Sequence, residues 1–309
     1  MRLLAEAVGR GKEVLAVLEL TARFDEEANI NWAEKLESLG VQVVYGVVGL
    51  KTHAKMLLIT RRDKRTGQLQ RYGHLSTGNY NARSARLYTD LSHLTCDAAI
   101  TEDMDAVFRH LSSHNRLPTL QQLVMAPFHL HSHMLERIGQ AASAAAKGKD
   151  ARIVLKMNAL TDEVLIAALI DAGALGVQID LIVRGACMLP AQVPGRTENI
   201  RVRSVIGRFL EHTRVFYFAW GTHEEVYLSS ADWMHRNMLR RVELAWPVHH
   251  RKLRQRIIDE CLADYLHDDR NAWQLQSDGR YQPPMRPSAG FGAQNMLMKN
   301  YGGAASARQ

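Results

Sequence analysis

Two stretches of the chain decide how it is built: Gly49-Leu-Lys-Thr-His-Ala-Lys-Met-Leu-Leu-Ile59 and Arg208-Phe-Leu-Glu-His-Thr-Arg-Val-Phe-Tyr-Phe218. Each places a histidine two residues before a cation, at the head of an apolar run that predicts a strand. Positive charge beside a histidine disfavours the imidazolium ion, so His53 is expected to stay neutral near neutral pH. The same cations suit an anion such as phosphate. A single copy is better explained as a basic strand end at the surface, so the functional interpretation depends on the recurrence of the motif.

The two stretches belong to a longer internal repeat. Residues 4–14 match residues 169–179 at an offset of 165, and His53 matches His212 at an offset of 159. Residues 75–79 then match residues 228–232 at an offset of 153, and Asp90 and Glu243 are separated by the same 153 residues. The offset decreases twice along the chain, as two differences in loop length between the copies would produce. The repeat therefore predicts a duplicated fold.

Each half carries the same set of polar residues: a His-x-(Lys/Arg) motif, a Ser-x-x-(Asn/Asp) motif one strand later, and then an acid. A pseudo-twofold axis would bring equivalent strand ends together, so we expect His53 and His212 to face each other across one cleft. Two histidines and several cations around one anion favour phosphoryl transfer, in which one imidazole attacks and the other acts as an acid or an electrostatic support. The predicted phosphate ligands are Lys55 and Arg214, and the groups predicted to orient them are Asn79, Asp90, Asp232 and Glu243.

Alternating helix and strand patterns predict an α/β fold of two tandem domains, residues 1–117 and 118–267. The expected helices are 2–10, 25–39, most of 101–147, 161–174 with Thr161 as its N-cap, and 251–267; the expected strands are 13–20, 41–48, 55–59, 152–160, 177–183, 201–206, 214–220 and 225–230. Residues 268–309 are poor in aliphatic residues and rich in Gly, Pro, Gln and Ser, which predicts a disordered tail.

The two copies differ at their beginnings. The second copy starts with a strand, residues 152–160, before its first helix, whereas the first copy starts inside the equivalent helix. We therefore expect the first domain to be truncated at its N-terminus, which would leave one position of its sheet unpaired.

Composition sets the outer limits of function. With 309 residues and 46% hydrophobic residues, the chain can bury a large core. A net charge of +7 and an isoelectric point near 9.4 suit a polyanionic partner, but they do not choose among nucleic acid, nucleotide, phosphate chain and membrane surface. Three widely spaced cysteines indicate a reducing compartment with no disulfide or zinc framework.

The sequence shows no apolar run long enough for a transmembrane helix and no signal peptide, so we expect a cytoplasmic protein and leave peripheral membrane association open. His129, His131 and His133 alternate as metal ligands can, but their segment reads as helical. His249 and His250 are expected at the surface, and Lys156 and Asn158 at the cleft.

The paired histidine motifs resemble those of the phospholipase D superfamily, in which His-x-Lys is followed by four residues and an aspartate. Here the fifth position after Lys55 is Thr60, and the fifth after Arg214 is Ala219. Because both aspartates are absent, phosphodiesterase or lipase chemistry is disfavoured.

Longer strings carry a closer resemblance. The chain resembles the type-1 polyphosphate kinase family from about residue 3 to about residue 265. The matching strings are ELTARFDEEANI, VVGLKTHAKMLLI, STGNYNARSARLYTD, LKMNALTDEV, LIVRGACML, ENIRVRSVIGRFLEHTRVFYF and VYLSSADWMHRN. The resemblance covers only that family's two C-terminal, phospholipase-D-like domains and not its N-terminal or head domains.

This resemblance implies reversible transfer of the ATP γ-phosphate to inorganic polyphosphate, with Mg²⁺ and a phosphohistidine intermediate. His53 matches the phosphorylated histidine, and His212 matches the second histidine beside the nucleotide phosphates. Tyr88 and Arg184 match residues that contact the nucleotide and its phosphates. Arg23 matches a residue of the magnesium–phosphate site, and because a guanidinium has no lone pair for a metal, its role would be to bind the phosphates that Mg²⁺ bridges.

The implied partners are ATP or ADP and polyphosphate, with no nucleic acid, and the full-length family implies a homo-oligomer. Three readings stay open. The favoured one is a catalytic part of a polyphosphate kinase. The second is a truncated, non-catalytic module that binds polyphosphate or another polyanion, and phosphodiesterase activity is the least favoured.

Overall fold

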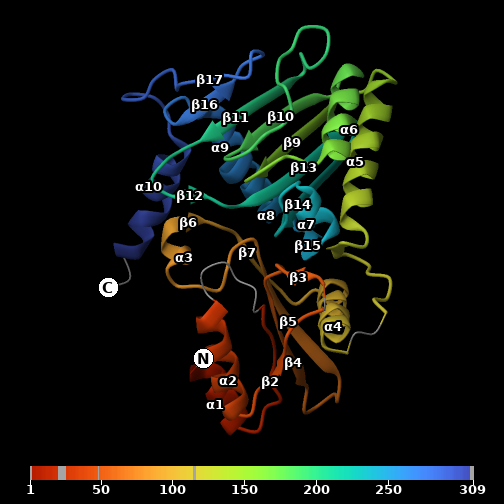
Figure 1. The fold of residues 1–309 in the computed structure, drawn as a ribbon, viewed down its shortest axis with the longest axis vertical. Helices are drawn as coiled ribbons and strands as arrows, with labels where there is room; N and C mark the ends of the chain where they lie inside the picture. Colours follow the sequence, from red (N-terminus) through yellow and green to blue (C-terminus); the bar gives the residue numbers. More distant parts are fainter. Residues whose placement is uncertain (1, 20–25, 48, 114–115, 307–309) are drawn as a thin grey trace.

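The computed structural model describes residues 2–19, 26–47, 49–113 and 116–306. Its centre is a mixed ten-stranded sheet contributed almost wholly by the second half of the chain (Figure 1). The strand order is β17 (Tyr281–Gln282), β16 (Ala272–Leu275), β11 (Ile200–Val205), β10 (Gln178–Val183), β9 (Ala151–Met157), β13 (Arg214–Trp220), β14 (His223–Ser229), β15 (Arg241–Pro247) and β3 (Lys51–Thr52), with β8 (Val124–Ala126) also paired to β15. Strands β9, β10 and β11 are parallel, whereas β13, β14 and β15 are antiparallel.

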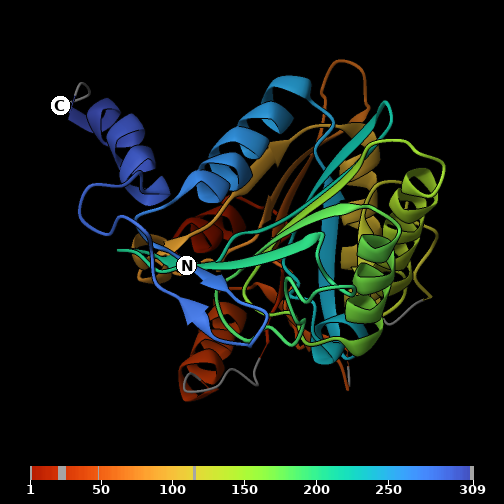
Figure 2. The ribbon, with the colours of Figure 1, turned by 90° about the horizontal axis from the view of Figure 1, so that it is seen from above.

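Both faces of this sheet are covered by helices, which is why its central strands β9, β10 and β13 are mostly apolar. Helices α5 (Leu130–Ala145) and α6 (Glu163–Ala174) cover one face, where Ile153 and Leu155 of β9 join their core. The other face is covered by α8 (Arg251–Ile257), a π-helical turn η1 (Ile258–Ala263) and α9 (Asp264–His267), against which Val154 packs. Figure 2 shows the two helical layers on opposite sides of the strands.

The first half repeats this plan with its sheet divided in two. Strands β1 (Leu15–Val17) and β2 (Gln42–Val44) pair in parallel beside α1 (Arg2–Gly9) and α2 (Glu26–Ser38). Strands β4 (Met56–Arg62), β5 (Leu69–Ser76) and β7 (Ser92–Thr95) form an antiparallel sheet that packs against α4 (Ala98–Ser113). In the second half, β9 joins the equivalent parallel and antiparallel parts; no strand among the described residues fills that place in the first half.

Two short strand pairs join the halves. Strand β3 runs parallel to β15, with Thr52 opposite Val242, and β6 (Tyr88–Thr89) runs parallel to β12 (Leu210–Glu211), with Thr89 opposite Glu211. These pairs are equivalent under the repeat, because Thr52 corresponds to Glu211 and Thr89 to Val242. The predicted α/β fold with internal duplication is thereby confirmed.

Two predictions about individual segments are wrong. The N-cap of α6 is Asp162 and not Thr161: the Asp162 carboxylate accepts a hydrogen bond from the Leu165 amide at 3.0 Å. Residues 268–306 are not a disordered tail, since β16 pairs with β11 and a final helix, α10 (Ala293–Ser306), follows. The segment needs few aliphatic residues because it adds to an existing sheet and buries only a small set of side chains, among them Ala272, Leu275 and Ala293.

The remaining helices are short: α3 (Ser84–Leu87) precedes β6, and α7 (His235–Leu239) precedes β15. Among the described residues, no helix is both long and apolar enough to cross a membrane.

Candidate active site

His53 stands directly after β3, and the pairing of that strand fixes its position. The backbone amides of His53 and Ala54 both donate to the Val242 carbonyl, at 2.9 and 3.0 Å. This register brings the His53 ring beside the next residue of β15, so that Nδ1 lies 2.8 Å from Glu243 Oε2. Glu243 is fully buried and also accepts from the Ser230 hydroxyl and from Asn237 Nδ2.

The electrostatics of this pair fix its protonation. Although burial alone would raise the pKa of Glu243, His53, Lys55 and the Ser230 hydroxyl hold that pKa below its ordinary value. Burial lowers the pKa of His53 below 6.5, and the effects of Lys55 and Arg214 add to the shift, although Glu243 opposes it. Glu243 is therefore ionised and His53 neutral near pH 7, with the ring proton on Nδ1 facing the carboxylate. That tautomer leaves the lone pair of Nε2 available.

His212 repeats this geometry from the other half. It follows β12, whose partner β6 leads into Asp90, and His212 Nδ1 lies 2.8 Å from Asp90 Oδ1. Thr77 donates to Asp90 at 2.8 Å, as Ser230 does to Glu243. Burial again lowers the pKa of the histidine. Each histidine is thus held by a carboxylate of the opposite half, a relation that sequence spacing alone did not specify.

The two cations differ although the repeat makes them equivalent. Arg214 is buried and donates to both carboxylate oxygens of Asp232, at 3.1 and 3.0 Å. Its Nη1 also donates to the His212 carbonyl at 2.8 Å and lies 3.0 Å from Nε2 and 3.3 Å from Nδ1 of the His212 ring. Lys55 is only 9% exposed, and within the described part of the chain its Nζ has no hydrogen-bond partner. Burial lowers the pKa of Lys55 from 10.5 to about 7.

The contrast extends to the histidines. Both ring nitrogens of His212 have neighbours: Asp90 lies 2.8 Å from Nδ1, and Arg214 Nη1 lies within 3.3 Å of both nitrogens. No described residue hydrogen-bonds to Nε2 of His53. A buried amine without a partner costs free energy unless a ligand satisfies it. The unpaired amine of Lys55, whose charge also acts on His53, therefore suits an anion.

A chain of hydrogen bonds connects Arg184 to this centre. Its Nε and Nη2 donate to Asn158 Oδ1 at 3.1 and 2.9 Å. The backbone amide and Nδ2 of Asn158 in turn donate to Asp232 Oδ1, at 2.7 and 3.1 Å. Arg184 and Asn158 follow the carboxyl ends of β10 and β9, the usual edge for a site in an α/β sheet.

Lys156 does not face the cleft as a free cation. It is 2% exposed, pairs with Glu211 at 2.7 Å, and its Nζ lies 3.3 Å from the centre of the Tyr265 ring. Thr89 also donates to Glu211, at 2.9 Å. Lys156 therefore supports the strand that carries His212.

Three further residues predicted for the site remain to be placed. Tyr88 tilts against the His212 ring, with ring centroids 5.2 Å apart. Asn79 is exposed, whereas its repeat partner Asp232 is buried on Arg214. Arg23 lies outside the described residues.

Sequence reasoning missed the hydroxyls of Thr77 and Ser230. A signal for them was present, because both occupy the second position of the Ser-x-x-(Asn/Asp) motif in the aligned repeat. Their amide partners are also equivalent: Leu91 donates to Thr77 Oγ1 at 3.0 Å and Leu244 to Ser230 Oγ at 3.1 Å.

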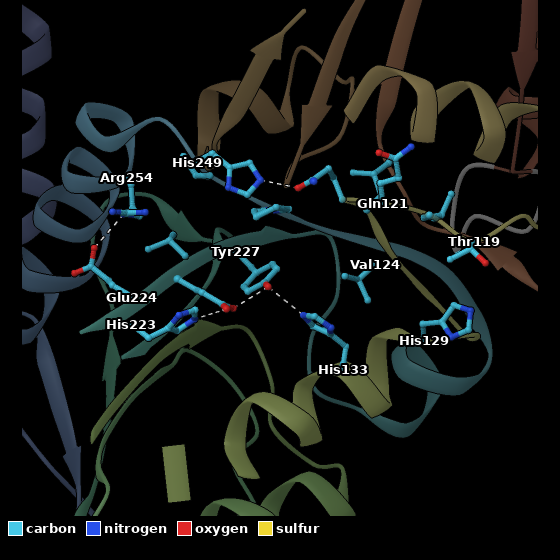
Figure 3. Close-up of a pocket in the computed structure, with 17 residues that line it drawn as sticks. Thr119, Gln121, Val124, His129, His133, His223, Glu224, Tyr227, His249 and Arg254 are labelled. Atoms are coloured by element: carbon cyan, nitrogen blue, oxygen red, sulfur yellow. Dashed lines mark hydrogen bonds and ion pairs between the residues drawn. The ribbon is translucent and has the colours of Figure 1, made fainter. Parts of the chain in front are cut away.

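Two of the three alternating histidines, His129 and His133, line a separate pocket of about 500 Å³ (Figure 3). There His133 contacts the Tyr227 hydroxyl at 3.1 Å, and that hydroxyl donates to Glu225 at 2.8 Å. His131 instead contacts Asp162 at 3.1 Å. Among the described residues, no three His, Cys, Asp or Glu side chains are grouped to hold a metal ion. Because its charged groups largely pair with one another, we do not place the chemistry in this pocket.

Comparisons with known proteins identify the family of the chain. Residues 1–117 match the family model "Polyphosphate kinase C-terminal domain 1", and residues 123–294 match "Polyphosphate kinase C-terminal domain 2". The chain is 55% identical over 284 residues to a polyphosphate kinase of Burkholderia cenocepacia, covering 91% of this chain and 41% of that protein. It is 52% identical over 303 residues to a polyphosphate kinase of Paraburkholderia phytofirmans, covering 97% of this chain and 44% of that protein.

A solved structure extends the agreement to three dimensions. The crystal structure of polyphosphate kinase from Porphyromonas gingivalis matches with a TM-score of 0.88 and 34% identity, covering 99% of this chain and 46% of that chain. The chain thus spans less than half the length of these relatives. The family-model matches, the sequence identities and the shared fold together show that the chain belongs to the polyphosphate kinase family.

Proposed function

We propose that this chain transfers the γ-phosphate of ATP reversibly to inorganic polyphosphate through a phosphohistidine at His53. The observation that carries the proposal is the difference between the two histidines. Among the described residues, neither Nε2 of His53 nor the amine of Lys55 has a hydrogen-bond partner, whereas Arg214 Nη1 lies 3.0 Å from Nε2 of His212.

In the first step, Nε2 of His53 attacks the γ-phosphorus. The N–P bond forms, the bond from phosphorus to the β–γ bridging oxygen breaks, and ADP leaves with that electron pair. The Nδ1 proton stays between His53 and Glu243, whose negative charge stabilises the positive ring that develops. In the second step, a terminal oxygen of polyphosphate attacks phosphorus, the N–P bond breaks, and the electron pair returns to Nε2.

Lys55 and Arg214 would stabilise charge on the phosphoryl group during transfer. An approaching phosphate favours the protonated amine and so opposes the effect of burial on Lys55. His212 would contact the nucleotide phosphates or act as an acid toward them, and Arg184 would bind phosphate from the adjacent strand end.

Mg²⁺ would enter with ATP and neutralise phosphate charge. The carboxylates closest to the histidines are committed to other partners: Glu243 to His53, Asp90 to His212, and Asp232 to Arg214. The described residues therefore fit a cation held mainly by phosphate oxygens, with Arg23 proposed to bind those phosphates.

The test is incorporation of ³²P from γ-labelled ATP with Mg²⁺, scored as acid-labile and base-stable label. We expect label in the unaltered chain and in His212→Gln, at a lower rate in the variant, and none in His53→Gln. Equal labelling of both histidine variants would refute the assignment of His53. If the chain is folded and binds polyphosphate but takes no label, the result would support the alternative that it is a non-catalytic, polyanion-binding module. Hydrolysis of a phosphodiester substrate would favour the third alternative.

A further inference from the structure

A second pocket, of about 810 Å³, adjoins the residues that contact His212. Tyr88, Thr89 and Asp90 line it from the first half of the chain, and Lys156 and Thr213 line it from the central sheet. Tyr88 lies against the ring of His212, and Asp90 holds that ring. The pocket thus shares Tyr88 and Asp90 with the surroundings of His212. At its rim, Arg86 and Arg208 are exposed.

The remaining wall comes from the last helix. Gln294, Leu297, Met298 and Tyr301 of α10 all line the pocket. Their spacing places them on one side of a helix, and we name this set the α10 face. Lys299 and Asn300 lie between them in sequence and are exposed. The match to the family model ends at residue 294, so three of the four residues of the α10 face lie beyond it.

The α10 face is anchored at both ends. Gln294 is 2% exposed; its amide exchanges two hydrogen bonds with the backbone of Phe209, each 2.9 Å, and donates to Glu211, the residue before His212. At the far end, the Tyr301 hydroxyl donates to Glu260 and accepts from Arg256. The first anchor ties α10 to the strand that carries His212, while the second lies at the surface.

The chemistry of the pocket defines its occupant. It combines tyrosine rings and two apolar side chains with the residues that contact His212 on one wall and with exposed cations. A flat ring system joined to phosphates fits this combination, whereas a bare phosphate chain offers nothing to an apolar wall. Resting on the proposed function, we propose that Leu297, Met298 and Tyr301 contact the nucleoside of bound ADP or ATP and determine how tightly nucleotide binds relative to polyphosphate.

The test compares binding of ADP and of polyphosphate to the full chain by titration calorimetry. In the double variant Leu297→Ala/Met298→Ala, we expect the Kd for ADP to rise about 10-fold, the scale of losing apolar contacts in a pocket, while the Kd for polyphosphate changes less than about 2-fold. Tyr301→Ala should weaken ADP binding likewise, whereas Tyr301→Phe should largely retain it, because the ring and not the surface hydroxyl makes the contact. Lys299→Ala/Asn300→Ala, on the exposed side of α10, is the matched control and should bind both ligands as the unaltered chain does.

Thermal unfolding of each variant separates loss of contact from loss of fold. An unchanged Kd for ADP in folded Leu297→Ala/Met298→Ala would overturn the inference, as would parallel weakening of polyphosphate binding or failure of the unaltered chain to bind ADP. The labelling of His53 is read separately. If the chain binds ADP through α10 but takes no label, this inference stands and the proposed function is refuted. If the chain is labelled but its affinity for ADP does not change in the α10 variants, the proposed function stands and this inference is refuted.

Discussion

Lys55 and Arg214 occupy equivalent places in the repeat, yet only one of them has its charge balanced directly. Asp232 neutralises Arg214 through two hydrogen bonds, while the repeat position of Asp232 in the first half holds the exposed Asn79. Because asparagine stands in the first half where the second half has aspartate, Lys55 is buried without the carboxylate partner that Arg214 has. The fold is symmetric, but the site is not, and its unpaired cation lies in the half that carries His53.

This asymmetry predicts opposite effects of Lys55→Met on stability and on phosphorylation. Removing a buried amine should raise the free energy of unfolding by about 1–4 kcal/mol near pH 6, while the rate of ³²P incorporation should fall about 100-fold or more. The gain in stability should shrink as pH rises. Between the folded pKa of about 7 and the ordinary value of 10.5, the unfolded chain binds more protons, so raising the pH stabilises the unaltered protein. Urea unfolding from pH 6 to 9 checks this, with Lys64→Met, an exposed lysine, as the control. A less stable Lys55→Met would contradict the prediction.

The carboxylates predict a second difference between the histidines. In Glu243→Gln, the amide no longer stabilises the Nδ1-protonated ring of His53, so the rate of labelling should fall about 100-fold. Asp90→Asn changes the equivalent bond on His212 and should reduce labelling much less. Histidine ¹⁵N chemical shifts provide a second readout, because Glu243→Gln should raise the fraction of His53 protonated at Nε2. Equal loss of labelling in the two variants would argue against distinct roles.

At the scale of elements, the segment after residue 267 is part of the folded structure because one carboxylate organises it. Asp268 is 2% exposed and accepts hydrogen bonds from the amides of Arg270, Asn271 and Ala293, so it links the start of β16 to the start of α10. Asp268→Ala should therefore lower the free energy of unfolding by about 2–4 kcal/mol. Asp278, which is exposed and accepts from the Arg280 amide in a turn, offers a control whose substitution by alanine should cost less than about 1 kcal/mol. Equal midpoints of urea unfolding for the two variants would mean that the segment does not contribute to folding.

The same element shows where sequence reasoning succeeds and where it stops. Periodicity located the main strands because both faces of β9 and β10 are buried, and the repeat paired His53 with His212 because duplication preserves strand ends. Composition misjudged residues 268–306, since a segment that docks on an existing sheet needs only a few buried groups such as Ala293 and Gln294. The partners of the histidines also could not be assigned. Glu243 and Asp90 cross between halves, and that crossing depends on the β3–β15 and β6–β12 pairs, which are only two residues long in register.

At the scale of the whole molecule, those short pairs and the two histidine–carboxylate contacts link the halves through the candidate site. His53 belongs to the first half and Glu243 to the second, while His212 and Asp90 reverse the order. The groups proposed for phosphoryl transfer therefore also hold the halves together. The protonation of the site should accordingly affect the stability of the entire chain.

Acid should consequently destabilise the molecule before its carboxylates titrate. Burial lowers the pKa of both His53 and His212 below 6.5 in the folded state. As pH falls below 6.5, the unfolded chain takes up protons that the folded chain excludes, so the free energy of unfolding decreases, by at most about 1.4 kcal/mol per pH unit for each histidine. Urea unfolding between pH 7 and 5 should show this slope, and His53→Gln/His212→Gln should reduce it. Part of the slope should remain, because burial also lowers the pKa values of His74, His93 and His133. His235→Gln/His250→Gln removes two exposed histidines and should leave the slope unchanged. A slope as steep in His53→Gln/His212→Gln as in the unaltered chain would mean that the site histidines do not couple the stability of the halves to pH.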